Sequence, residues 1–332
     1  MFRVWFEREM PDHVATILAG VATSIGPGTA TPQDLLSSVG EADAIIASSL
    51  ATYDGPGMDR APHLRVISRT GIGVDKIDLG AATARGVAVC NTPDAPTIST
   101  AEHAITLMLS VAKRVGGSQR ALESGGRDFF GSHEGREVAG KVLGLLGIGR
   151  IGRNVARMAG GLSMTVIAYD PFAEATVAAE AGIQMVDSLD QLLADGDVVS
   201  LHLPLTSETE QLMNAEHIAQ MKPGAILVNT ARGRLVDHDA LLAALSSGRV
   251  FGAGLDVTDP EPLPPDHPLL HRDDVVVTPH VAAATAAGKA RLYESAVTQA
   301  LQVLQGEYPN HLVNPDVWPV RRQGSFTKEK QP

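Results

Sequence analysis

The sequence predicts an α/β protein with two doubly wound domains, each a parallel sheet with helices on both faces. Three observations support this prediction. The 332 residues are enough for about two domains at roughly 150 residues each. Short apolar runs alternate with amphipathic stretches along nearly the whole chain. Aromatic residues make up only 4% of the sequence, so small and branched aliphatic side chains, which suit buried parallel strands, must fill the core.

In the N-terminal part, apolar runs predict strands at 44–47, 64–68 and 87–90, with helices at 32–39 and 79–85 between them. A longer helix is predicted at 97–115, because Ile98, Ala101, Ile105 and Leu109 recur at steps of three and four. We expect Gly116-Gly117 to end this helix, which would lead into the second domain.

From residue 140 the alternation becomes stronger. It predicts a helix at 150–160 and strands at 141–147, 165–170, 197–202, 225–229, 252–256 and 275–278. A final helix at 284–306 is expected to return to the N-terminal domain. We therefore predict a discontinuous first domain, residues 1–105 plus 282–332, interrupted by a second domain at 106–281.

Charge and composition argue against several classes of protein. A formal net charge of −11 argues against a nucleic-acid binder, because phosphate binding needs clustered Lys and Arg. The basic residues of the tail, Arg321, Arg322, Lys328 and Lys330, are interpreted as a frayed terminus. No run of 18 uncharged apolar residues is present, and the charged N-terminus is unlike a signal peptide, so neither a membrane span nor a leader is expected.

The single cysteine, Cys90, fits a reducing, cytoplasmic location and is interpreted as a core thiol in a short strand. No histidine or cysteine cluster has the spacing of a metal site, so no metal is expected. Glu102 and His103 on the long helix are interpreted as packing or capping residues.

A glycine motif follows the strand at 141–147. Gly147, Gly149 and Gly152 have the G-x-G-x-x-G spacing, with Arg150 and Ile151 at the start of the next helix. Such a turn lets a pyrophosphate approach the backbone and the free N–H groups of the helix. Asp170 ends the next strand, where a carboxylate accepts from ribose hydroxyls and repels a 2′-phosphate. The unit predicts NAD rather than NADP, although Arg150 and Arg153 would partly offset that preference. The alternative is a structural glycine turn beside a surface acid.

Three further residues follow later strands, where doubly wound sheets bind ligands: Arg232, Glu261 and His280. Hydride transfer on a 2-hydroxy acid needs a cation for the carboxylate, an acid/base for the hydroxyl proton and a partner for that base. Each residue alone also fits an ordinary surface role.

Together, these stretches resemble the D-isomer-specific 2-hydroxyacid dehydrogenases. The similarity lies in Asn229-Thr230-Ala231-Arg232-Gly233, in 254–257 continuing to Glu261-Pro262, and in Thr278-Pro279-His280. Residues 69–75, 91–93 and 101–102 are similar to the substrate loop and the interdomain segment of that family. The resemblance extends over about residues 40–315 and includes the glycine motif in register.

The resemblance implies a Rossmann NAD-binding domain inserted into a flavodoxin-like substrate domain, with the site in the cleft between them, in a homodimer. It implies that Arg232 binds the substrate carboxylate and carbonyl, that His280 is the acid/base and that Glu261 is its partner. Gly71, Ile72 and Gly73 would bind the substrate carboxylate through the backbone. The implied cofactor residues are His202, Pro204, Thr230, Ala231 and Asp256, the last at the nicotinamide carboxamide.

The implied activity is the interconversion of a small 2-hydroxy acid and its 2-keto acid, such as glyoxylate, hydroxypyruvate or a phosphoglycerate-like compound. Two positions depart from the family pattern: Ala282 replaces a common glycine, and Lys76 replaces a common asparagine. We also expect no C-terminal regulatory domain, because the chain ends soon after Leu312.

Two alternatives remain open at this point. A formate dehydrogenase is disfavoured by Glu261, because formate has no carbonyl oxygen that needs a proton and the formate enzymes of the family resemble one another in lacking this glutamate. An NAD-sensing corepressor on the same fold can keep all three residues, and only the absence of a long interaction tail argues against it.

Overall fold

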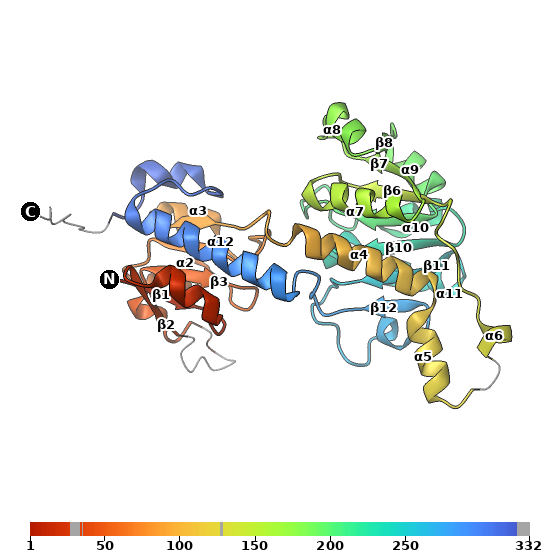
Figure 1. The fold of residues 1–332 in the computed structure, drawn as a ribbon, viewed down its shortest axis with the longest axis horizontal. Helices are drawn as coiled ribbons and strands as arrows, with labels where there is room; N and C mark the ends of the chain where they lie inside the picture. The colour runs from red at the N-terminus through yellow and green to blue at the C-terminus, as the bar shows by residue number, and fades with distance from the viewer. Residues whose placement is uncertain (27–33, 35, 127–128, 324–332) are drawn as a thin grey trace, which may run out of the picture. The chain divides into compact units, whose positions relative to one another are not determined.

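The computed structural model describes residues 1–26, 34, 36–126 and 129–323. The chain forms two compact units (Figure 1). The first unit contains residues 1–96 and the chain from residue 285 onward, and the second unit contains residues 97–284. The second unit is thus inserted into the first. It begins earlier than the predicted domain at 106–281 because the whole of the long helix at 97–112 packs on its sheet.

The first unit is built on a five-stranded parallel sheet with the order β2-β1-β3-β4-β5, which is the flavodoxin-like order. Its strands are β1 Phe2–Phe6, β2 Ala22–Ile25, β3 Ala44–Ala47, β4 Val66–Arg69 and β5 Ala88–Cys90. Its helices are α1 Ala15–Leu18, α2 Gly55–Asp59, α3 Leu79–Ala84 and α12 Ala286–Gln305, with 3-10 turns at Asp12–Val14, Val39–Glu41 and Pro315–Val320.

Both faces of this sheet are buried. On β3, Ala44 and Ile46 join the core under α12, whereas Ile45 and Ala47 join the core under α2 and α3. Helix α12 is the predicted C-terminal helix. It begins after Thr285, whose side chain accepts from the Gly288 N–H, and ends at Gly306 with φ 87°. The prediction that this helix returns to the N-terminal domain is confirmed by its packing on β3 and β4.

One helix prediction for the first unit was wrong, and two of its strands were missed. Residues 36–38 of the predicted helix at 32–39 form a turn that leads into the 3-10 turn at Val39–Glu41, and residues 32, 33 and 35 lie outside the described residues. Ser37, Ser38 and Gly40 are poor helix formers, and Ser38 instead accepts from the Trp5 indole. Strands β1 and β2 were not predicted.

The prediction of a frayed tail was also wrong for Arg321 and Arg322. The Arg322 guanidinium donates to the carbonyls of Pro62 and Leu64, and its N–H donates to the Gly86 carbonyl. Arg321 lies over the Trp318 ring at 3.8 Å. These contacts hold the segment against the first unit. The other two, at 328 and 330, lie outside the described residues.

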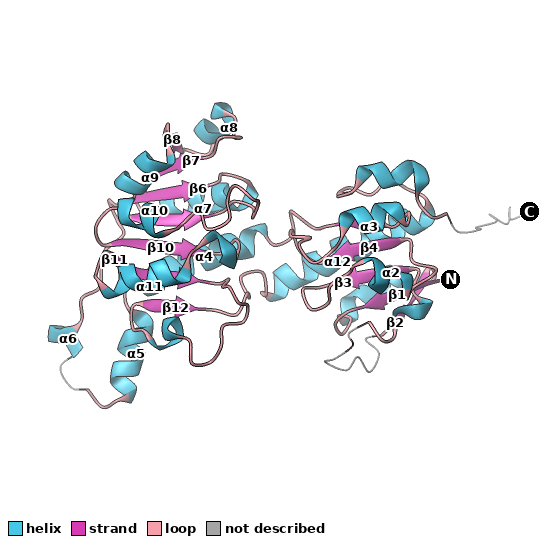
Figure 2. Cartoon of the chain, turned by 180° about the vertical axis from the view of Figure 1, so that it is seen from behind, coloured by secondary structure: helices cyan, strands magenta, loops and turns pink. Residues whose placement is uncertain are grey.

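The second unit contains a seven-stranded parallel sheet in the order β12-β11-β10-β9-β6-β7-β8, the Rossmann order extended by one strand (Figure 2). Its strands are β6 Val142–Leu146, β7 Thr165–Tyr169, β8 Gln184–Met185, β9 Val198–Leu201, β10 Ala225–Asn229, β11 Val250–Leu255 and β12 Val275–Val277. The two parallel-sheet α/β domains predicted from the sequence are therefore confirmed.

Helices cover both faces of the second sheet. Helices α4 and α7 pack on one face, and α9, α10 and α11 pack on the other. The helices are α4 Thr97–Ala112, α5 Val115–Glu123, α6 Phe129–Ser132, α7 Arg150–Gly161, α8 Ala175–Glu180, α9 Leu189–Asp195, α10 Ala215–Gln220 and α11 His238–Ser246, with 3-10 turns at Gly233–Leu235 and Pro268–His271.

The predicted end of the long helix at Gly116-Gly117 was wrong. Helix α4 ends at Ala112, Arg114 adopts a left-handed conformation with φ 48°, and the two glycines lie in the first turn of α5. At Gly117 a Cβ would lie 3.2 Å from the Asp273 carbonyl oxygen. Gly117 therefore permits a close helix contact instead of ending a helix.

Glycines also allow α4 to lie close to β11. A Cβ at Gly252 would lie 2.4 Å from the Asp274 carbonyl oxygen and 2.6 Å from Val111 of α4, and a Cβ at Gly254 would lie 2.8 Å from the Leu107 Cβ. The two glycines are two residues apart on the strand, so both lie on the face that packs against the helix. No described helix is both long and apolar enough to cross a membrane.

The Gly252→Ala variant should lose stability, because its added methyl group overlaps backbone and Val111 in a packed interface. Overpacking of this kind costs about 1–3 kcal/mol, which should appear as a lower unfolding temperature by circular dichroism. Gly160→Ala is the matched control: Gly160 is an exposed position of α7, and no described atom lies within 4 Å of its Cβ position. The control should be neutral or more stable. Equal unfolding temperatures for the two variants would contradict the close-packing argument.

Candidate active site

The register of the seven-stranded sheet places the ends of six strands in one row. Neighbouring strands pair directly at the residues Tyr169, Leu146, Leu201, Asn229, Leu255 and Val277. The next residue of each strand therefore leaves the sheet at the same edge: Asp170, Gly147, His202, Thr230, Asp256 and Thr278, in the same order. Five of these six were predicted as cofactor residues from the sequence, and the structure brings all five to one edge.

The glycine turn lies at this edge, between β6 and α7. A Cβ at Gly147, where φ is 91°, would lie 2.7 Å from the His202 carbonyl oxygen, and a Cβ at Gly152 would lie 2.3 Å from that of Gly147. Packing thus requires two of the three glycines. Gly149 differs, because no atom of the described residues lies within 4 Å of its Cβ position and its φ is −61°. Its missing side chain leaves open space at the N-terminus of α7, where a pyrophosphate fits.

Asp170 ties the end of β7 to the glycine turn. One carboxylate oxygen accepts from the Ile148 N–H at 2.9 Å and the other from the Phe172 N–H at 3.0 Å. A carboxylate oxygen has more than one lone pair. Each oxygen can therefore still accept from a ribose hydroxyl.

Thr230 and His202 are two polar residues of the row, and they differ in their hydrogen bonds. Thr230 is 8% exposed, and its hydroxyl has no hydrogen-bond partner in the described part of the chain. A buried hydroxyl without a partner is uncommon and fits a position that contacts a ligand. His202 bonds to the Ser200 hydroxyl at 2.8 Å, and burial lowers its pKa to about 4. His202 is therefore neutral near pH 7 and adds no positive charge. Pro204 is exposed two residues further on, and Ala231 is half-buried beside Thr230.

Arg232 is presented by a tight turn after β10. The Asn229 side chain, fully buried, accepts from the Ala231 N–H at 3.0 Å and donates to the Arg232 carbonyl at 2.8 Å. A Cβ at Gly233 would lie 2.0 Å from the Thr258 carbonyl oxygen, so no other residue fits there. The half-buried Arg232 guanidinium donates to the Ala231 carbonyl at 2.7 Å. The turn fixes its backbone on both sides.

His280 and Glu261 form a direct pair at the same edge. The His280 Nδ1 and a Glu261 carboxylate oxygen are 2.7 Å apart, and each side chain is 41% exposed. His280 also has a left-handed backbone with φ 53°. Such a conformation is uncommon outside glycine, and strained residues of this kind cluster at functional sites. The pair can hold an imidazole with Nδ1 engaged and Nε2 directed elsewhere.

The predicted substrate loop at 71–73 belongs to the first unit and so is not part of this row. It follows β4, and Gly71 has φ 154°. The Asn91 side chain donates to the Ile72 carbonyl at 2.8 Å, and the Thr92 N–H donates to the Gly71 carbonyl at 3.0 Å. No acceptor among the described residues takes the N–H of Ile72 or Gly73. These two N–H groups can therefore bind an anion.

Thr278 in the row and His103 beside it were not identified as site residues from the sequence. The Thr278 hydroxyl donates to Asp256 at 2.6 Å, and His103 of α4 contacts Thr278 at 2.9 Å. Thr278 does follow a strand, which was a usable signal. His103 gives no such signal, because its contact depends on how closely α4 packs on β11. The described residues include no group of three His, Cys, Asp or Glu side chains that could hold a metal.

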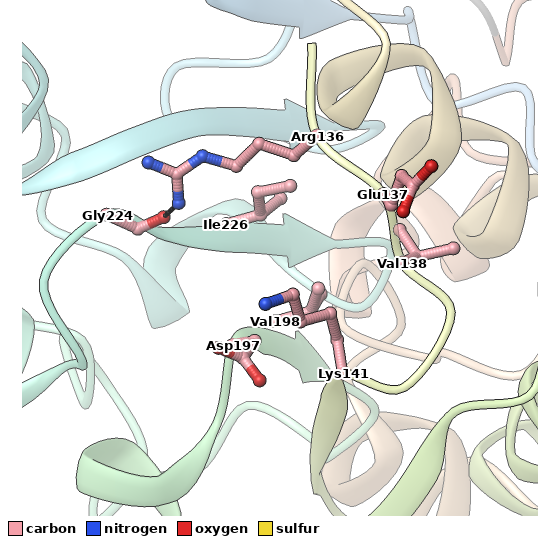
Figure 3. Close-up of a pocket in the computed structure, with 8 residues that line it drawn as sticks. All are labelled: Arg136, Glu137, Val138, Lys141, Asp197, Val198, Gly224 and Ile226. Carbon is pink, nitrogen blue, oxygen red and sulfur yellow. Dashed lines mark hydrogen bonds between the residues drawn. The ribbon is translucent and has the colours of Figure 1, made fainter.

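A cavity of about 380 Å³ lies at the opposite edge of this sheet, where Lys141, Asp197 and Gly224 precede β6, β9 and β10 (Figure 3). Its lining has both charge signs. The Arg136 guanidinium donates to the Gly224 carbonyl and lies 4.1 Å from the centre of the Phe251 ring. None of the predicted site residues lines this cavity.

Cys90 is fully buried in β5, as predicted, and burial raises its thiol pKa to about 12. Since only the thiolate reacts, a thiol-specific disulfide reagent at pH 8 should label no cysteine in the folded protein and one per chain after denaturation. Rapid stoichiometric labelling of the folded protein would contradict the burial of Cys90.

Residues 105–282 match the family model for the NAD-binding domain of D-isomer-specific 2-hydroxyacid dehydrogenases. The glyoxylate reductase of Korarchaeum cryptofilum is 37% identical over 97% of this chain and 98% of its own length. The D-3-phosphoglycerate dehydrogenase of Archaeoglobus fulgidus is 43% identical over 76% of this chain, and the match spans 48% of that longer protein. A crystal structure of a Thermus thermophilus protein, 40% identical, covers 94% of this chain and 100% of its own with a TM-score of 0.85.

Proposed function

The chain belongs to the family of D-isomer-specific 2-hydroxyacid dehydrogenases, and we propose that it is an NAD-dependent enzyme that interconverts a small D-2-hydroxy acid and its 2-keto acid. The observation that carries this proposal is the pair of His280 Nδ1 and Glu261 at 2.7 Å. The pair lies in loops that leave the sheet at the same edge as the glycine turn and the turn of Arg232. An acid/base, a cation and a dinucleotide turn at one sheet edge are what this chemistry requires.

The cofactor proposal rests on the fit of the residues at the glycine turn. The open space at Gly149 would accept the pyrophosphate, with Arg150 and Ile151 at the helix start, and Asp170 would accept from the adenosine ribose. His202, Pro204, Thr230 and Ala231 would line the rest of the site, and the buried hydroxyl of Thr230 has no partner among the described residues. When bound, NAD(H) accepts or supplies the hydride.

His280 would move the proton. Because Nδ1 is engaged by Glu261, the exchangeable proton sits on Nε2. In the reducing direction Nε2 would give this proton to the carbonyl oxygen, and in the oxidising direction it would take the hydroxyl proton. The Glu261 carboxylate stabilises the positive charge on the imidazole. Arg232 would hold the substrate carboxylate and polarise the carbonyl, and the N–H groups of Ile72 and Gly73, with Gly71 shaping the turn, would also bind the carboxylate.

A small substrate is supported by the relative that this chain matches over nearly its full length, which is named a glyoxylate reductase. The chain spans only about half the length of the D-3-phosphoglycerate dehydrogenases that it matches. Glyoxylate, hydroxypyruvate and phosphoglycerate-like acids are therefore the substrates to test. We also propose a homodimer, supported by the exposed Val115 and Leu122 on α5, and a cytoplasmic location, supported by the single buried Cys90.

The test of the proposal is a panel of 2-keto acids with NADH, followed by absorbance. We expect turnover of at least one small acid. His280→Ala should lower kcat by about 10²–10⁴-fold, because a positioned acid/base contributes that much, and should leave NADH affinity within about twofold. Glu261→Gln keeps the shape of the pair and removes its charge, so its loss should be smaller.

Two results would count against the proposal. If NADH binds and no acid is turned over, the chain is a binding protein on this fold. If His280→Ala abolishes NADH binding instead of turnover, His280 is not the acid/base.

The preference for NAD should depend on the charge of Asp170. Asp170→Asn keeps an acceptor for the Ile148 N–H and removes the repulsion of a 2′-phosphate. The ratio of kcat/KM for NADH over NADPH should fall by at least about tenfold, since like charges in contact cost several kcal/mol. Asp170→Ala also removes the bond to the turn and should weaken both cofactors. An unchanged ratio in Asp170→Asn would remove Asp170 from the cofactor site.

A further inference from the structure

We propose that Asp256, Thr278 and His103 form a positioning network that holds the loop of His280 in its working conformation. This inference rests on the proposed role of His280 as the acid/base. It gives Asp256 a role through the loop, beside the cofactor contact that the family resemblance implies. It also gives Thr278 and His103 roles that the sequence did not suggest.

Asp256 bonds the loop on both sides of His280. Its carbonyl accepts from the His280 N–H at 2.7 Å. One carboxylate oxygen accepts from the Thr278 hydroxyl at 2.6 Å and from the Val281 N–H at 2.9 Å. The other accepts from the Ala282 N–H at 2.9 Å. Asp256 thus bonds to the residue two before His280, to His280 itself and to the two residues that follow it.

The Asp256 carboxylate is set up for this internal role. Its side chain exposes no surface. Burial would raise the pKa of Asp256, but hydrogen bonds from His103, Thr278 and the two backbone N–H groups hold it below its usual value. The charged form is therefore satisfied by protein donors. A carboxylate with no exposed surface contacts a cofactor only after the surrounding loop moves.

The network holds His280 in a strained backbone conformation. His280 lies in the left-handed region with φ 53°. A side chain with a Cβ is disfavoured there, so the conformation persists only where its surroundings impose it. The bonds from Asp256 to the loop supply that constraint. The direction of the His280 side chain, and hence its 2.7 Å contact with Glu261, follows from this backbone.

His103 extends the network into α4. Its Nε2 lies 2.9 Å from the Thr278 hydroxyl oxygen and 3.4 Å from the Asp256 carboxylate. The Thr278 hydroxyl donates its hydrogen to Asp256, so it accepts from His103, which requires the proton on Nε2. His103 reaches this position because Gly254 lets α4 lie against β11. The helix therefore orients the hydroxyl that orients the carboxylate.

The experiment compares Thr278→Val, which keeps the side-chain shape and removes the hydroxyl, with Thr278→Ser, which keeps the hydroxyl. His103→Ala and His103→Gln form a second pair, the glutamine retaining an N–H donor. Thr165→Val is the control: Thr165 is exposed at the start of β7, at the other edge of the sheet. Each variant is assayed for kcat, KM and NADH affinity, and for amide hydrogen exchange across 278–284.

We expect Thr278→Val and His103→Ala to lower kcat by about tenfold to a hundredfold, the scale of a small misplacement of a catalytic group. NADH affinity should stay within about twofold. The amides of His280, Val281 and Ala282 should exchange faster. Thr278→Ser and His103→Gln should recover most of kcat and slow exchange, and Thr165→Val should match the wild type.

The proposal is overturned if exchange at 280–282 is unchanged in Thr278→Val, or if NADH affinity falls while kcat at saturating NADH is kept. The second outcome would make this a cofactor-binding cluster. If the wild type turns over no keto acid, the proposed function fails, and the exchange data still decide whether the network holds the loop.

Discussion

The parallel register of the seven-stranded sheet is the constraint on which the site depends. Six strands pair at one level, from Tyr169 to Val277, so the six residues that follow them emerge together. The backbone hydrogen bonds of the ladder set this level, and both faces of the sheet are buried by helices. A slip of one residue would exchange the side chains of the two faces. The site is thus assembled by the same bonds that hold the core.

A second constraint is how little space separates the sheet from α4. Gly252 and Gly254 of β11 remove two side chains that would otherwise overlap Val111 and Leu107. As a result α4 lies closer to the sheet, and its residue His103 reaches Thr278 at the strand ends. A feature that looks like ordinary core packing therefore also determines which groups surround His280.

The sequence was sufficient wherever one local pattern determined one local structure. The glycine turn, six of the seven strands of the second unit and α12 were predicted because their apolar periods and caps are local. The two-residue strand β8 was not predicted, because it is too short to show a period. The residues Arg232, Glu261 and His280 were identified because each follows a strand and matches a family motif, and their proposed roles still need experiment. In contrast, β2 has only one fully buried side chain, Ala22, and is held mainly by pairing with β1, which no local pattern shows. The contact of His103 with Thr278 spans 175 residues and depends on tertiary packing. Arg322 donates hydrogen bonds to carbonyls of a loop that is distant in sequence, whereas composition alone suggested a frayed terminus.

The interruption of the first unit by the second has a consequence for synthesis. Helix α12 supplies Ala296, Val297, Ala300 and Leu304 to the core that also contains β1 and β3. Residues 1–96 therefore cannot complete this core until α12 has left the ribosome. The second unit is continuous in sequence and has its own core. It can therefore fold before the N-terminal strands have α12 to pack against. Vectorial synthesis usually lets the first-made domain fold first. Here the second unit is the first that can complete its core, although strands β1 to β5 are made before it.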